Sequence, residues 1–348
     1  MFILIIYAII NAIGGDIMKD GFVRVGCASF DMKLGNVKAN ADQIIKYAHK
    51  ASEEHIKILL FPELCLTGYT IEDLFYQKRV LNEVTQQLEH ILDATYELDL
   101  FMVIGAPFIH MNKLYNCAIA LCGGEILGVI PKTYIPTYHE FYEGRHFASA
   151  PQECTEIMIN GDYISFGTDI IFESFHHEHL KIAVEICEDL WAPLPPSTKH
   201  CLNGATLILN PSASNDLTSK SDYRRLLVSS HSARLICGYA YCNAGLGEST
   251  TDVVFSNHHI IAENGTLLEE SVQYETGLIY SYIDLDKLVS ERIEMSTYET
   301  RNDHYHFIPF EIDTEDLELE RYYNPYPFVP SDTEQRAMRC KEVFDIQM

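Results

Sequence analysis

Short apolar runs alternate with amphipathic stretches along most of this chain. Residues 22–30 form a β-branched and aromatic run, which predicts a strand, and residues 37–52 follow with apolar positions at helical spacing. Residues 56–61 are continuously apolar, as expected of a strand that is buried on both faces. The chain is therefore predicted to open with a strand, a helix and a second strand.

The same alternation continues to residue 283. Residues 115–121 and 125–130 predict a hairpin about Gly123 and Gly124, and Asn264-Gly265 is a strong tight-turn signal. Helices are also expected at 72–98 and 222–236, and strands at 101–107, 182–186, 205–209, 238–243, 253–255, 260–262 and 278–283. This much alternation favours an α/β fold of two sheets with outer helices, and it leaves the strand order open.

The two ends of the chain depart from this pattern. Residues 1–18 contain an apolar run that falls far short of the roughly 20 residues of a membrane-spanning helix, and no Lys or Arg precedes it as in a secretory signal. We favour a mis-called start with Met18 as the initiator, and a signal or anchor or a native extension are the alternatives. Residues 19–290 are expected to form one domain, and residues 291–348 a connecting arm that regains helical character from Thr333.

Composition excludes several classes of function. The chain carries 50 acidic and 25 basic residues, and a net charge of -25 would repel a phosphate backbone, which argues against nucleic acid as a partner. The ten cysteines show no regular spacing and no CxxC pair, which favours a reduced, cytoplasmic protein without a structural metal. No segment is long and apolar enough to suggest a membrane partner.

Three polar residues stand where predicted buried strands end. Glu63, Lys132 and Cys187 each follow an apolar run, the position at which α/β sheets present side chains to a ligand. A thiol is nucleophilic as the thiolate, so it needs a base for its proton and a cation for the charge that develops on a substrate oxygen. Taken singly, the three residues would instead be a strand-end cap, a surface charge and a small core side chain.

The surrounding segments favour the chemical interpretation. Residues 61–69 read FPELCLTGY, residues 131–143 read PKTYIPTYHEFYE, and residues 184–191 read VEICEDLW, and all three resemble the nitrilase superfamily. Together with NPSASN at 210–215 and GESTTD at 247–252, they look like the glutaminase domain of glutamine-dependent NAD synthetases. The resemblance runs from about Gly21 to the end of the chain.

This resemblance implies a fold and a mechanism. The fold would be the nitrilase-like α-β-β-α sandwich, two mixed sheets flanked by helices. Cys187 would attack the side-chain amide of glutamine and form a thioester, while Glu63 would accept the thiol proton, protonate the departing ammonia and later activate water. Lys132 and the backbone N–H of Glu188 would stabilise the oxyanion. Glu143 matches the second glutamate of the superfamily, which orients the lysine or the substrate; a solvated loop charge is the alternative.

The resemblance also implies residues that bind the substrate. Tyr138, Ser214 and Lys220 match positions that hold glutamine, with hydroxyls for its amide and carboxylate and a cation for its carboxylate. Tyr69 and Phe141 are expected to form pocket walls, and core packing is the alternative for both.

The implied partners are L-glutamine and an NAD synthetase domain, and a homo-oligomer is expected. The SGG-type pyrophosphate loop of that second domain is missing from the chain, so we interpret the sequence as an isolated domain or a truncated gene. The glutaminase part would need no cofactor, with ATP and Mg²⁺ confined to the absent domain. Two rivals remain: a stand-alone amidase that acts on another small amide, and a catalytically idle scaffold.

Overall fold

The structure is a computed structural model. It describes residues 21–313, 319–323, 325–326, 328–330 and 332–348. The expected extension at residues 1–18 lies outside the described residues. The chain divides into two compact units, Met1–Asp316 and Leu317–Met348, which are described separately below.

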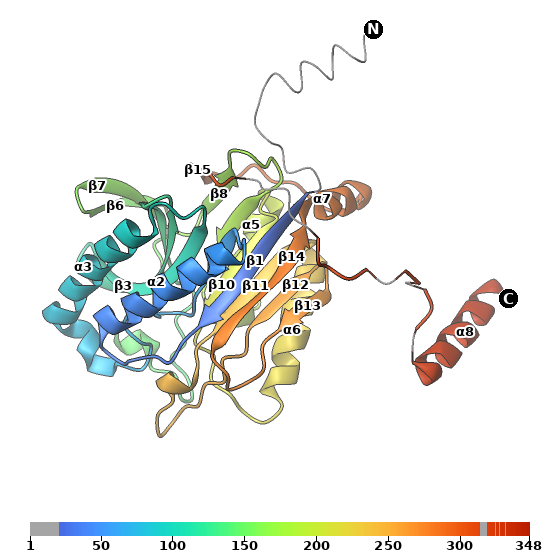
Figure 1. The fold of residues 1–348 in the computed structure, drawn as a ribbon, viewed down its shortest axis with the longest axis horizontal. Coiled ribbons are helices and arrows are strands. Elements are labelled where there is room, and N and C mark those ends of the chain that lie inside the picture. Colours follow the sequence, from blue (N-terminus) through green and yellow to red (C-terminus); the bar gives the residue numbers. More distant parts are fainter. Residues whose placement is uncertain (1–20, 314–318, 324, 327, 331) are drawn as a thin grey trace, which may run out of the picture. The chain divides into compact units, whose positions relative to one another are not determined.

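The first unit is built around two sheets that face each other (Figure 1). One has eight strands in the order β14-β1-β2-β3-β4-β5-β7-β6, and the other has seven in the order β13-β12-β11-β10-β9-β8-β15. Both sheets mix parallel and antiparallel pairs. The strands are β1 (Phe22–Ser29), β2 (Ile58–Leu60), β3 (Phe101–His110), β4 (Lys113–Cys122), β5 (Glu125–Pro131), β6 (Thr155–Ile159), β7 (Asp162–Phe166), β8 (Ile170–Ser174), β9 (Lys181–Val184), β10 (Leu207–Ser212), β11 (Gly238–Asn243), β12 (Ile260–Glu263), β13 (Thr266–Glu270), β14 (Gly277–Asp284) and β15 (His306–Phe310).

Helices cover the outer faces of both sheets, with α2 and α3 over the eight-stranded sheet (Figure 1). The α-helices of the first unit are α2 (Val37–Glu53), α3 (Lys78–Thr95), α4 (Glu188–Trp191), α5 (Pro196–Leu202), α6 (Lys220–Leu235) and α7 (Leu285–Glu294). Three short 3-10 helices are η1 (Glu72–Tyr76), η2 (Glu143–Arg145) and η3 (Leu246–Glu248). The arrangement confirms the expected α-β-β-α sandwich.

Alternation along the strands explains the layers. Val23 and Val25 of β1 point into the core between the sheets, where they join Leu207 and Leu209 of β10. Ile208, one position along, points to the opposite face and packs with the helices outside the second sheet. Because successive strand residues face opposite sides, a strand that is covered on both faces must be apolar throughout. The continuous apolar runs in the sequence are these central strands.

The predicted turns are confirmed. Cys122 pairs with Glu125 across the β4–β5 hairpin, and Gly123 and Gly124 between them have φ values of 56° and 77°. Two consecutive residues with positive φ form the turn whose twist matches antiparallel strands, and glycine adopts them at low cost. Asn264-Gly265 connects β12 to β13 in the same way.

Other elements differ from the prediction. Residues 253–255, expected as a strand, lie in a loop, and the expected helix at 72–98 divides into η1 and α3 at Gln77, which has an extended ψ of 116°. Strand β15 falls inside the stretch expected to be a connecting arm, yet it pairs in parallel with β8 at the edge of the second sheet. Only Phe310 of this strand is buried, so it lacks the continuous burial that marks the central strands.

The second unit contains α8 (Thr333–Gln347), the helix expected near the end of the chain. Asp332 caps it, because its side chain accepts a hydrogen bond of 2.8 Å from the backbone N–H of Gln335. Every described residue of α8 is exposed.

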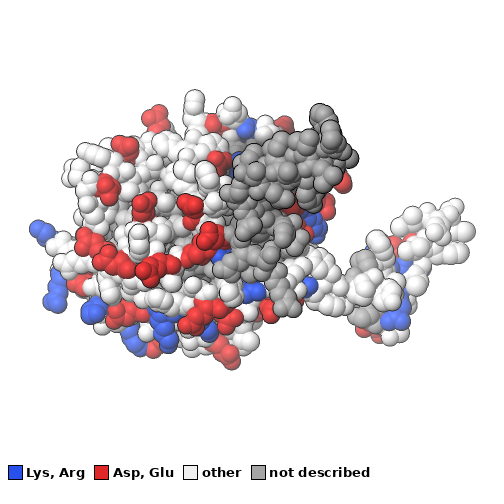
Figure 2. Space-filling view, turned by 45° about the horizontal axis from the view of Figure 1, so that its top comes forward, with Lys and Arg blue, Asp and Glu red and all other residues white. Residues whose placement is uncertain are grey.

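Acidic side chains form a band across the middle of the face in Figure 2, with acidic and basic side chains mixed below it. The net charge of the chain is -25. Among the described residues, no helix is both long enough and apolar enough to cross a membrane.

Gly105 of β3 lies against the turn that carries Glu63, and a Cβ at this glycine would stand 2.2 Å from the backbone nitrogen of Leu64. We expect Gly105→Ala to lower the free energy of unfolding by about 1 to 3 kcal/mol or more, because backbone atoms cannot move aside as a flexible side chain can. Gly277→Ala is the matched control, since nothing lies within 4 Å of the Cβ it would add. Chemical denaturation of both variants measures the difference, and equal stabilities would contradict the close approach.

Candidate active site

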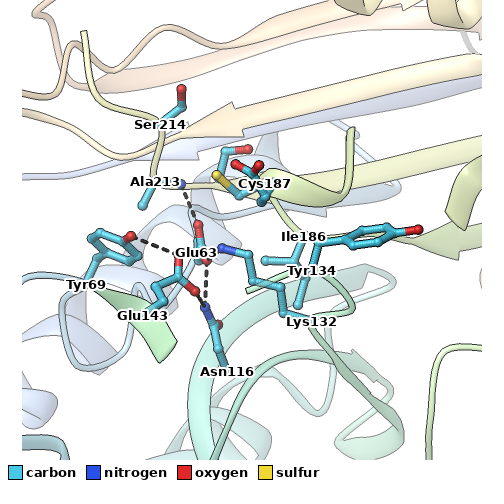
Figure 3. Close-up of polar contacts among 12 residues, drawn as sticks. Glu63, Tyr69, Asn116, Lys132, Tyr134, Glu143, Ile186, Cys187, Ala213 and Ser214 are labelled. Atoms are coloured by element: carbon cyan, nitrogen blue, oxygen red, sulfur yellow. Dashed lines mark hydrogen bonds and ion pairs between the residues drawn. The ribbon is translucent and has the colours of Figure 1, made fainter. Parts of the chain in front are cut away.

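The ends of three strands meet at one place, shown in Figure 3. Glu63 follows β2 and Lys132 follows β5, both in the eight-stranded sheet, whereas Cys187 follows β9 in the seven-stranded sheet. All three side chains are buried, with 1%, 0% and 5% of their residue surface exposed. The site is therefore assembled between the two sheets, and neither sheet holds it alone.

The end of β10 joins the two halves of the site. Asn210 Oδ1 and the Pro211 carbonyl accept hydrogen bonds from the backbone N–H of Cys187, at 3.0 and 3.1 Å. The next turn of the chain holds Glu63, because the backbone N–H of Ala213 donates to its Oε2 at 2.8 Å. The NPSASN block thus contacts the nucleophile candidate through its first residues and the base candidate through its later ones.

Cys187 stands on a strained turn between β9 and α4. Its φ of 45° and ψ of -97° lie outside the regions that L-residues ordinarily adopt. The turn projects the sulfur toward the Glu63 carboxylate and the Lys132 ammonium (Figure 3). Asp189 secures this turn and the Lys132 segment together, since its carboxylate accepts the backbone N–H groups of Ile186 at 2.9 Å and Tyr134 at 2.8 Å.

Lys132 forms the electrostatic centre of the site. Its Nζ donates to Oε1 of Glu63 and to Oε1 of Glu143, each at 2.6 Å. Asn116 binds the same two carboxylates, because its Nδ2 donates to Glu63 Oε1 at 2.6 Å and to Glu143 Oε2 at 3.3 Å. One ammonium and one amide thus hold two buried carboxylates in place.

The pKa values follow from this arrangement. Burial acts to lower the Lys132 pKa, but the carboxylates of Glu143 and Glu63 outweigh it and the pKa stands well above its usual value. Burial raises the pKa of Glu143 to about 7, against the opposing effect of Lys132. Burial and the Glu63 carboxylate raise the pKa of the Cys187 thiol well above its usual value. The resting sulfur is therefore protonated, and it needs a base to become a nucleophile.

A second group of predicted residues lies nearer the surface. Tyr138 is 48% exposed, and its hydroxyl donates to Glu188 Oε1 at 2.7 Å. Lys220 is held between aromatic rings, with its Nζ 5.8 Å from the centre of Phe141 and 5.2 Å from that of Trp191. Because Tyr138 also packs against Phe141, with 5.9 Å between the ring centres, these contacts bring a carboxylate, a phenol and an ammonium near the Phe141 ring.

Tyr69 and Phe141 line one pocket. Glu143 contributes to the wall of this pocket, whose space is about 580 Å³ with open solvent included. The hydroxyl of Tyr69 donates to Glu143 Oε1 at 2.9 Å, so this side chain belongs to the polar site as well as to the wall.

Ser214 is oriented differently from the other predicted residues. It is 2% exposed, its Oγ lies 3.5 Å from Arg224 Nη2, and its hydroxyl points away from Glu63 in Figure 3. Its backbone N–H donates to Asn243 Oδ1 at 2.8 Å.

Sequence reasoning missed several residues that hold the site. Asp189 and Asn210 lie inside quoted motifs but had no assigned role, and their partners are backbone groups that no motif reveals. Asn116 had no local signal at all. It reaches the site because β4 pairs with β5, and its carbonyl accepts the backbone N–H of Lys132 at 2.8 Å. Among the described residues, no group of three or more His, Cys, Asp or Glu side chains is arranged to hold a metal ion.

Residues 24–292 match the family model described as carbon-nitrogen hydrolase. The chain belongs to the carbon-nitrogen hydrolase family. All three of the converging strand ends lie inside this carbon-nitrogen hydrolase region, as do the NPSASN and GESTTD blocks.

Curated relatives of this carbon-nitrogen hydrolase include glutamine-dependent NAD(+) synthetases. That of Mycobacterium tuberculosis is 38% identical over 341 residues, which cover 95% of this chain and 50% of the relative. That of Aquifex aeolicus is 29% identical over 76% of this chain and 43% of the relative. The chain spans about half the length of the curated relatives that it matches most extensively.

Solved structures show the same fold. A glutamine-dependent NAD(+) synthetase from Cytophaga hutchinsonii superposes with a TM-score of 0.68 and 29% identity, covering 75% of this chain and 43% of that one. An amidase from Nesterenkonia sp. superposes with a TM-score of 0.61 and 20% identity, covering 81% of this chain and 97% of that one. The two-sheet sandwich is thus shared with proteins of different lengths.

The strained turn at Cys187 leads to a stability prediction. The free energy of unfolding of Cys187→Gly should be about 1 kcal/mol higher than that of Cys187→Ala, because glycine adopts positive φ without the strain that a Cβ brings. This gain should outweigh the larger entropy of glycine in the unfolded chain. Urea denaturation of the two variants measures the difference. If Cys187→Ala were the more stable, the turn would not store backbone strain.

Proposed function

We propose that this chain hydrolyses the side-chain amide of L-glutamine through a Cys187 thioester and supplies the ammonia to an NAD synthetase domain. The observation that carries the proposal is the Cys187 thiol facing a buried Lys132 ammonium that is shared by Glu63 and Glu143 (Figure 3). The similarity to glutamine-dependent NAD(+) synthetases over 95% of the chain supports glutamine as the amide.

Acylation uses the groups as they stand. Glu63 accepts the thiol proton while the sulfur attacks the amide carbon, and the negative charge that develops on the amide oxygen is stabilised by Lys132 and the backbone N–H of Glu188. Glu63 then returns the proton to the departing nitrogen, so that ammonia leaves and a glutamyl thioester remains. Deacylation reverses the roles: Glu63 deprotonates water, which attacks the thioester and releases glutamate and the Cys187 thiol.

Glu143 acts in this scheme as a fixed counter-charge. It shares the Lys132 ammonium at 2.6 Å and is itself held by Tyr69 and Asn116. The ammonium is thereby directed at one point in the site before the substrate arrives, which lowers the reorganisation needed when the oxyanion forms.

The opening of the site suits an amino acid. Lys220 offers a cation for the α-carboxylate, and the Glu188 carboxylate beside Tyr138 offers an anion for the α-ammonium. Ser214 is assigned by resemblance to the same binding site, and its hydroxyl would need to turn from Arg224 to contact the ligand. Tyr69 and Phe141 form the walls around the aliphatic part.

The steps above use side chains and backbone groups alone, so the glutaminase reaction is proposed to need no cofactor. ATP and Mg²⁺ are assigned to the synthetase domain, which is proposed to adenylate its dinucleotide substrate and to accept the ammonia. We propose a cytoplasmic homo-oligomer in which the two domains work together.

Cys187→Ala should abolish ammonia release from glutamine and leave the fold intact, because it removes one sulfur atom.

A diazoketone analogue of glutamine should label Cys187 in the parent chain and none of the other nine cysteines, of which eight are wholly or partly buried. Peptide mapping by mass spectrometry identifies the labelled residue. Labelling spread over several cysteines, or ammonia release by Cys187→Ala, would contradict the mechanism. Faster hydrolysis of butyramide than of glutamine would favour the stand-alone amidase.

Lys132→Met should reduce kcat at least about 100-fold while changing KM for glutamine less than threefold, because the ammonium is needed chiefly when the oxyanion forms. The substitution leaves two carboxylates without their shared cation, so near-ultraviolet circular dichroism must first show that the variant is folded. Lys132→Arg keeps the charge and serves as the comparison if Lys132→Met does not fold. A raised KM with unchanged kcat would reassign Lys132 to ground-state binding.

A further inference from the structure

The GESTTD block has no role in the chemistry described above, yet its glutamate is among the most deeply buried acids in the described chain. Glu248 is 1% exposed, and no described Lys, Arg or His forms an ion pair with it. Its carboxylate instead accepts hydrogen bonds from one short segment that contains Tyr69 and Thr70. A buried carboxylate without a cation costs free energy unless its oxygens are well satisfied, so these contacts need an explanation.

The hydrogen bonds divide between the two carboxylate oxygens. Oε1 of Glu248 accepts the backbone N–H of Tyr69 at 2.7 Å. Oε2 accepts the backbone N–H of Thr70 at 3.0 Å and lies 2.8 Å from the Thr70 hydroxyl. Burial raises the pKa of Glu248, and these donors oppose the rise. Because each oxygen serves a different backbone N–H, both must be acceptors at once, and a carboxylate meets that condition whereas an amide does not.

Glycines allow close packing around this contact, and a Cβ at Gly68 would stand 3.4 Å from Glu248 Oε1. A Cβ at Gly245 would stand 1.6 Å from Asn257 Oδ1, and one at Gly247 would stand 2.8 Å from the backbone nitrogen of Met32. On the other side, Gly68 has a φ of 90° and directs the chain into Tyr69. The GLGEST and FPELCLTGY segments lie far apart in the sequence and contact each other through the hydrogen bonds of Glu248.

Tyr69 connects the hydrogen bonds of Glu248 to the groups that are proposed to react. Its hydroxyl donates to Oε1 of Glu143 at 2.9 Å, and the same oxygen accepts from Lys132 Nζ at 2.6 Å. Its ring packs edge-on against Phe255, with 5.9 Å between the ring centres. A shift of the Tyr69 backbone would move the hydroxyl away from Glu143, and the ammonium would follow the carboxylate that holds it.

We propose that Glu248 is a positioning residue of the active site: by fixing the backbone of Tyr69 and Thr70, it holds the Tyr69 hydroxyl on Glu143 and so sets the position of the Lys132 ammonium. This inference rests on the proposed function for its assay with glutamine. It assigns the GESTTD glutamate to the geometry of the oxyanion-stabilising group and not to substrate contact.

A double-mutant cycle tests the proposal, with Glu248→Gln, Tyr69→Phe and the double variant. Glu248→Gln changes one atom and turns an NH₂ group toward a backbone N–H, so we expect kcat for glutamine to fall at least about tenfold. Tyr69→Phe removes the hydroxyl on which Glu248 is proposed to act. In the Tyr69→Phe background, Glu248→Gln should therefore change kcat less than about twofold. An equal loss in both backgrounds would overturn the proposal, because Glu248 would then act by another route.

Glu263→Gln is the control for altering a buried carboxylate. Glu263 is 1% exposed and accepts the backbone N–H of Asp284 at 2.7 Å, and, unlike Glu248, it forms an ion pair with Lys287 at 3.6 Å. It pairs with Gly238 at the start of β11, and β11 reaches the active-site end only at Asn243. The Glu263→Gln variant should leave kcat unchanged. A loss of kcat as large as that of Glu248→Gln would show a general effect of altering buried carboxylates and would also overturn the proposal.

A second measurement separates this inference from the proposed function. The rate at which iodoacetamide alkylates Cys187, followed by mass spectrometry against pH, depends on the nearby Lys132 charge and not on the identity of the substrate. Glu248→Gln should shift this profile in the parent background and leave it unchanged in the Tyr69→Phe background. If the parent chain does not hydrolyse glutamine but the profile shifts in this way, the function fails and the positioning role stands. An unshifted profile in the parent background overturns the positioning role.

Discussion

The buried ammonium of Lys132 is the interaction on which the site depends. Two carboxylates and one cation share a space from which water is excluded, and such an arrangement is tolerable only when its members satisfy one another. Burial raises the pKa of Glu143, and the Lys132 ammonium opposes that rise, so the cation is what makes the buried carboxylate tolerable. A cation therefore lies beside the Cys187 thiol, where the proposed reaction would create negative charge.

The sandwich explains how this group is held. Lys132 and Glu63 extend from one sheet and Cys187 from the other, and the end of β10 contacts both sides through Asn210 and Ala213. Most of these contacts are made by backbone groups, whose positions are fixed by the strand ladders. The sequence motifs therefore contain residues that hold backbone segments close together as well as residues that are proposed to react.

Much of this could be predicted from the sequence. The central strands are covered on both faces and read as apolar runs, and the three candidate side chains follow such runs, so both the two-sheet fold and the convergence of Glu63, Lys132 and Cys187 could be anticipated. What escaped prediction depends on pairing between distant segments. Asn116 reaches the site because β4 pairs with β5. Strand β15 joins the second sheet by pairing with β8, and its mostly exposed residues do not form the buried run that is typical of the central strands.

The division of the site between two sheets has a consequence for how the protein ages or responds to stress. The apolar layer between the sheets also separates the strand ends that carry Cys187 and Glu63, and Cys187 itself belongs to that layer. Loosening of this layer would separate the sulfur from Glu63 while each sheet kept its own hydrogen bonds. The proposed activity should therefore be more sensitive to a change in inter-sheet spacing than the secondary-structure content is. It should be lost before either sheet unfolds.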